Sequence, residues 1–174
     1  MKNRYRAAPV AIVGLCLVFG VGTPALPQTQ SPNPGAVQKG AVVTTHAKGT
    51  FEVKLSPQEA YAGNEGLGRM SIDKQFHGEL EGTSKGEMLT GMSSVQGSGV
   101  YVAIERVSGT LHGRTGTFIL HHTGIMTRGA PSLTVTVAPD SGTGQLAGLT
   151  GKMMIDITDG KHSYDFEYTL ADTP

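Results

Sequence analysis

The chain has 174 residues, with 25 glycines, one cysteine, no tryptophan and only 16% charged residues. This length allows one domain with a proper hydrophobic core and a tail. Its 14 basic and 14 acidic residues balance, so charge gives no indication of nucleic-acid binding or of attraction to an anionic membrane.

The N-terminal segment has the order of a secretory signal peptide. Basic residues come first, an apolar run follows over residues 7–22, and small residues surround Ala25. The run is short for a membrane-spanning helix, which needs about 20 residues. We therefore predict a signal peptide over residues 1–27, export to the periplasm or the medium, and no stable membrane insertion after cleavage. Cys16 lies in this segment, so the exported chain contains no disulfide.

The next segment, residues 28–43, is polar and rich in proline and glycine, which predicts a flexible linker. The folded domain is expected over residues 44–171. Near its start, Ser56–Glu59 has the residues of a capping box and predicts a single short helical turn. No other part of the sequence is a helix candidate.

The rest of the domain has the alternation of apolar and polar residues that is typical of half-buried strands. Gly-x-Leu-x-Gly occurs three times, at residues 78–82, 109–113 and 144–148, where glycines mark corners between strands. Asp159-Gly160 predicts a hairpin turn. The predicted strands are 47–55, 69–81, 86–92, 100–112, 115–127, 132–138, 150–158 and 161–170.

Eight strands with short connections and glycine-marked bends favour a single antiparallel eight-stranded β-barrel, because closure removes exposed strand edges. The same alternation is compatible with a two-sheet sandwich. The fold class is therefore all-β, with the barrel as the expected architecture.

Four segments resemble one bacterial family, catalogued as domain of unknown function 3224, over residues 44–170. They are TTHAKGTFEV at 44–53, DKQFHGELEGTSKG at 73–86, YVAIERVSGTLHGR at 101–114 and DGKHSYDFEYTL at 159–170. The resemblance implies a barrel similar to plant allene oxide cyclase, an isomerase, but it implies no activity and assigns no residue a role. Members of the family begin close to the TTHAKG segment and lack an export signal, whereas this chain has 43 residues before Thr44. If translation instead starts near Val43, the protein is cytoplasmic.

The sequence has no nucleophile elbow, phosphate-binding loop or zinc-ligand spacing. His121 and His122 are adjacent, but neighbouring residues on a strand point to opposite faces, so one ion cannot bind both. We therefore predict no metal and no cofactor.

A candidate site follows from the alternation, because residues of the same parity on a strand share a face. Lys74, Arg106 and His122 each have the parity of the apolar residues on their strand, and Tyr164 and Tyr168 have inward parity on the last strand. We expect these five residues to line a cavity inside the barrel. The apolar residues that share the parity of Lys74 are Met70, Ile72, Phe76 and Leu80. Those that share the parity of Arg106 are Val100, Val102 and Ile104, and those that share the parity of His122 are Phe118, Leu120 and Met126.

Basic groups inside a barrel need a partner, water or a ligand, because burying an unpaired charge is costly. The three basic residues can meet the anionic head of a small apolar molecule. They can also lie at the barrel mouth, face outward beyond a bulge, or pair internally with Glu105 or Glu79. The preferred hypothesis is therefore that the protein is a small-molecule binding module. The alternatives are an isomerase or cyclase, with His122 as proton shuttle, and a self-associating structural module.

Overall fold

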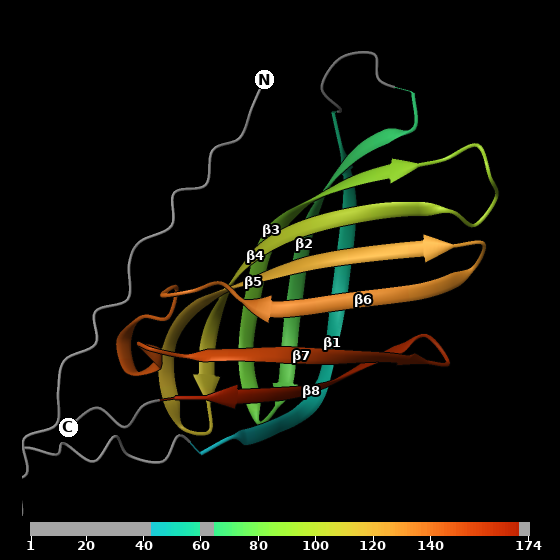
Figure 1. Cartoon of the computed structure of the whole chain (residues 1–174). Coiled ribbons are helices and arrows are strands. Elements are labelled where there is room, and N and C mark those ends of the chain that lie inside the picture. Colours follow the sequence, from blue (N-terminus) through green and yellow to red (C-terminus); the bar gives the residue numbers. More distant parts are fainter. Residues whose placement is uncertain (1–42, 60–64, 171–174) are drawn as a thin grey trace, which may run out of the picture. The chain divides into compact units, whose positions relative to one another are not determined.

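The chain forms a closed antiparallel β-barrel in a computed structural model that describes residues 43–59 and 65–170 (Figure 1). Across these residues, eight strands pair in sequence order, and the last pairs with the first. This confirms the predicted barrel and excludes the sandwich. The predicted signal peptide and the predicted linker, except its last residue Val43, lie outside the described residues. The strands are β1 (Thr45–Gln58), β2 (Leu67–Gly78), β3 (Leu80–Met92), β4 (Gly99–Leu111), β5 (Arg114–Thr127), β6 (Ala130–Val137), β7 (Thr150–Thr158) and β8 (Lys161–Thr169).

Two-residue turns join several neighbouring strands. In the β7–β8 turn, Asp159 and Gly160 both have positive φ, 52° and 74°, as the type I′ turn requires. Arg128 and Gly129 repeat this geometry between β5 and β6, with φ of 48° and 88°. The twist of such turns matches that of the strands they join, and the predicted Asp-Gly hairpin is confirmed.

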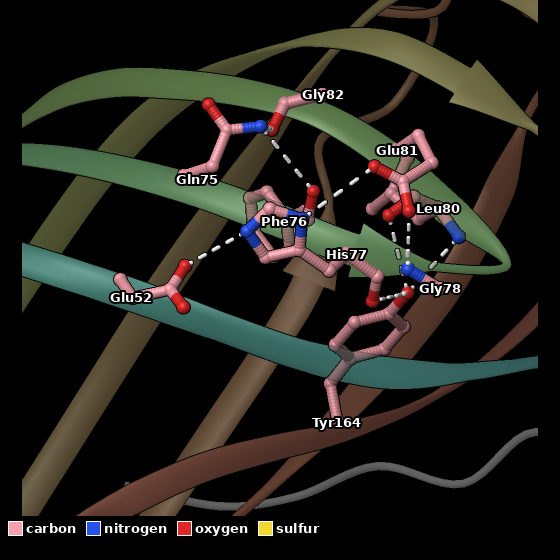
Figure 2. A network of polar contacts seen from close by, with 9 residues as sticks. All are labelled: Glu52, Gln75, Phe76, His77, Gly78, Leu80, Glu81, Gly82 and Tyr164. Carbon is pink, nitrogen blue, oxygen red and sulfur yellow. Dashed lines mark hydrogen bonds and ion pairs between the residues drawn. The ribbon is translucent and has the colours of Figure 1, made fainter.

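The β2–β3 hairpin turns earlier than predicted. The strand expected over residues 69–81 ends at Gly78, and its partner begins at Leu80 rather than at residue 86. Gly78 has a φ of 111°, and its N–H donates to the Glu81 carboxylate at 2.7 Å (Figure 2). The GTSK sequence after Glu81 looks like a turn but lies inside β3, because this local geometry already reverses the chain.

The helical turn predicted at Ser56–Glu59 is wrong. Ser56, Pro57 and Gln58 belong to β1 and pair with β2. Pairing of β1 with β8 extends only to Phe51, so Pro57 faces no second partner strand that would need its missing N–H. In the described residues the helical element is instead a single 3₁₀ turn, η1 (Gly144–Leu146), within the third glycine repeat.

The barrel interior has a filled half and a hollow half. Aromatic rings fill the half near the β2–β3 hairpin, where Phe118 and Phe166 stack with ring centroids 5.7 Å apart. At the other end, β6 and β7 separate, since Thr136 and Lys152 form the single residue pair recorded between them in the described chain. No helix among the described residues is long and apolar enough to cross a membrane.

Candidate functional site

The hollow half of the barrel contains an apolar cavity of about 590 Å³. It opens at the end of the barrel that carries the β3–β4 loop, and strands from all sides contribute to its wall. Its volume lies within the range of small-molecule binding sites, about 300–1,000 Å³. Side chains that form the wall include Phe51, Val53, Ile72, Met88, Leu133 and Ile155.

A buried polar cluster lies where the cavity meets the filled half. It consists of Lys74 on β2, Ser84 on β3, Glu105 on β4 and His122 on β5, all at most 6% exposed. Glu105 is at its centre. Its Oε1 accepts from Lys74 Nζ at 2.7 Å and contacts His122 Nε2 at 2.9 Å, while its Oε2 accepts from Ser84 Oγ at 2.7 Å. We call these four residues the Glu105 cluster.

The Glu105 carboxylate remains ionised although it is completely buried. Burial by itself raises the pKa of this carboxyl, but the hydrogen bond with His122 and the charge of Lys74 outweigh burial and lower the pKa from 4.5 to about 2. The cluster thus combines one firmly negative group with one ammonium and one imidazole. The Glu105 cluster is stable only while each of its members keeps its partner, because an unpaired charge in the barrel interior is costly.

Two members of the cluster also face the cavity, namely Lys74 and His122. The Lys74 ammonium lies 4.9 Å from the centre of the Phe51 ring, close enough for a cation–π interaction. Because His122 Nε2 contacts Glu105, the ring nitrogen left for a ligand is Nδ1. The apolar cavity therefore ends in one ammonium and one imidazole nitrogen.

The structure places Lys74 and His122 as predicted, and it confirms the alternative in which they pair internally with Glu105. Arg106 does not join them, and its predicted inward orientation is wrong. On β4 the buried residues are Ala103, Glu105 and Val107, so Arg106 lies on the exposed outer face.

The reason for this error is visible on the outer surface. Val102 and Ile104, which share the parity of Arg106, are 51% and 63% exposed. Because apolar residues occupy both faces of β4, alternation does not reveal which face is inside. The need to compensate buried charge is a better indicator of the inner face than alternation. Two inward basic groups require an inward acidic group, and Glu105 on β4 can be that group.

The two tyrosines predicted in the site point inward but do not line the cavity. Tyr164 accepts a hydrogen bond from the Leu80 N–H at 2.9 Å and supports the β2–β3 hairpin (Figure 2). The Tyr168 hydroxyl contacts His112 Nδ1 at 2.7 Å. Both belong to the filled half of the barrel, because inward parity does not tell where along the barrel axis a residue lies.

Two further polar residues of the wall, Tyr101 and His162, were not predicted. The Tyr101 ring packs against Gly124, where any added Cβ would overlap it. His162 packs against Phe51 with ring centroids 4.9 Å apart. In the sequence Tyr101 stands between apolar residues, and nothing there indicates that it lines a cavity. Once the strand register is known, its pairing with Gly124 on β5 shows where the ring finds room.

Metal ligation finds no support in the described part of the chain, where no group of three or more His, Cys, Asp or Glu side chains is placed to hold an ion.

Comparison with known proteins gives one family. A family described as a protein of unknown function (DUF3224) matches residues 47–168. A crystal structure from Shewanella oneidensis MR-1, of a protein with unknown function from the same family, is 51% identical. That similarity covers 75% of this chain and 100% of the other, with a TM-score of 0.71. No curated protein has detectable similarity to this chain. The family expected from the sequence is thereby confirmed, and this chain belongs to the DUF3224 family.

Proposed function

We propose that this protein is a binding module for a small, mainly apolar molecule and that it acts after export. The observation that carries the proposal is the 590 Å³ apolar cavity that ends at the Glu105 cluster. A simple structural barrel of eight strands can fill its interior with side chains, whereas this one fills only half. An apolar wall with a few convergent polar groups is the usual composition of a ligand site.

The charges of the cluster favour a ligand with one polar end. Lys74 and His122 present hydrogen-bond donors or acceptors at the inner end, while Val53, Ile72 and Ile155 surround the space above them. A molecule with an apolar body and a carboxylate or other polar head matches this distribution. The separation of β6 from β7 gives such a molecule a side from which to enter.

Binding can be tested with the neutral dye N-phenyl-1-naphthylamine, whose fluorescence rises in apolar surroundings. Val53→Phe places a larger side chain in the cavity, and Val102→Phe makes the same change on the outer face, where Val102 is 51% exposed. We expect saturable dye binding by the wild type and by Val102→Phe, and at least tenfold weaker binding by Val53→Phe. Equal binding by all three proteins would place the dye outside the cavity, and no binding by any would remove support for the function.

The export component has its own test. Its support is the N-terminal sequence, with its basic start, apolar run and small-residue site. The mature protein recovered from the host envelope or medium should lack about the first 27 residues by denatured mass. A full-length mass in the cytoplasmic fraction would contradict export and leave the cavity proposal untouched.

A further inference from the structure

The charges around His122 restrict how an anion can enter the cavity. Lys74 and Glu105 are both buried and bonded to each other, so their charges already compensate. A carboxylate arriving beside them would therefore add one uncompensated negative charge in an apolar cavity, which is costly. A second positive charge is needed, and His122 is the other member of the cluster, besides Lys74, that faces the cavity.

We infer that the cavity binds a carboxylate with an apolar tail together with one proton, which His122 carries. This inference rests on the proposed function and specifies its ligand. With His122 protonated, Nε2–H donates to Glu105 and Nδ1–H is free to donate to the carboxylate. The cluster and the ligand head then hold two positive and two negative charges.

The groups that face His122 from the neighbouring strands are compatible with this state. Beside Glu105 and Lys74, β3 contributes the neutral hydroxyl of Ser84, and β6 contributes the apolar Val135, which is paired with His122.

Two other titratable groups lie on the cavity wall, Tyr101 on β4 and His162 on β8. Burial, followed by the charge of Glu105, raises the pKa of Tyr101, so its hydroxyl stays neutral. His162 is the alternative proton carrier, but it packs on the Phe51 ring and no contact with Glu105 is recorded for it among the described residues. It serves as the matched control.

The experiment is isothermal titration calorimetry with decanoate and with decanol, which have similar tails and differ in charge. At pH 8, titrations in phosphate and in Tris report proton uptake, because these buffers have different ionisation enthalpies. We expect uptake of nearly one proton per decanoate and of none per decanol. Decanoate affinity should fall by close to tenfold per pH unit between pH 8 and pH 9, while decanol affinity stays constant.

The variants assign the proton. His122→Gln keeps an amide that can donate to Glu105 but cannot take up a proton, and His162→Gln makes the same change on β8. Proton uptake should disappear in the first variant and persist in the second. Retention of uptake in His122→Gln, or its loss in His162→Gln, would overturn the assignment to His122.

Wild-type data suffice if His122→Gln does not fold. Decanoate binding without proton uptake, or decanol binding without decanoate binding at any pH from 6 to 9, would overturn the inference while the proposed function stands. Failure of both compounds and of the neutral dye to bind would instead count against the proposed function itself.

Discussion

Replacement of Glu105 by glutamine tests the energetic role of the buried cluster. Glutamine has nearly the same shape as the protonated glutamic acid, so the change removes the charge and keeps the packing. The pKa of this carboxyl falls from 4.5 to about 2 in the folded protein. This difference corresponds to about 3 kcal/mol of stability at neutral pH, which Glu105→Gln should remove. The ion pair with Lys74 is part of this contribution, because the charge of Lys74 helps to lower the pKa of Glu105.

The assay is equilibrium unfolding in urea, compared between the wild type and Glu105→Gln from pH 7 to pH 2. The folded-state pKa lies below the unfolded value, so the stabilisation is complete above about pH 5 and declines as the pH falls toward 2. The difference between the two proteins should therefore shrink to roughly half or less at pH 3 and nearly vanish at pH 2.

A control for this experiment is Glu87→Gln, which breaks the exposed ion pair with Arg69 on the outer surface. Its effect on the free energy of unfolding should be much smaller, because solvent screens exposed pairs. Two results would refute the reasoning on Glu105. One is a loss below about 1 kcal/mol at pH 7, and the other is an equal loss at pH 7 and pH 3, which would indicate disturbed packing rather than a lost charge.

Three further substitutions test individual contacts. Tyr164→Phe leaves the Leu80 N–H without its acceptor and should cost about 1–3 kcal/mol in urea unfolding, and no loss would show that water replaces the hydroxyl. Arg106→Met, on the outer face, should change stability by less than about 0.5 kcal/mol and leave dye affinity unchanged, whereas weaker dye binding would return Arg106 to the site. Gly124→Ala forces the Tyr101 ring off its position and should lower both the melting temperature and dye affinity, so a variant identical to the wild type would contradict the observed packing.

The sequence was sufficient for the architecture because strand periodicity and turn chemistry are local properties. Asp159 and Gly160 specify a type I′ turn by themselves, and the alternation on β8 has one apolar face only. The helical turn predicted at Ser56–Glu59 shows the limit of local signals. There the ladder between β1 and β2 overrides a helix-start pattern, since Ser56, Pro57 and Gln58 continue the pairing of β1 with β2.

The sequence placed part of the candidate site, and it offered the central residue, Glu105, only as a possible internal partner of the basic groups. Polar residues flank Lys74 and His122 on the outer face, namely Asp73 and Gln75 on β2 and His121 and Thr123 on β5, so parity places both inside. Glu105 and Arg106 lie on a strand with apolar residues on both faces, where parity does not discriminate, so Arg106 was expected inside although it lies outside. The cavity itself depends on where along the axis the side chains stop filling the interior, which no single strand reveals.

The central claim is that an apolar molecule occupies the cavity with its polar head at the Glu105 cluster. A crystal structure of the protein grown with saturating decanoate tests it most directly. The account predicts density for the alkyl chain among Val53, Ile72 and Ile155, with the carboxylate between Lys74 and His122. A cavity that contains only water, or that the surrounding side chains have filled, would contradict it.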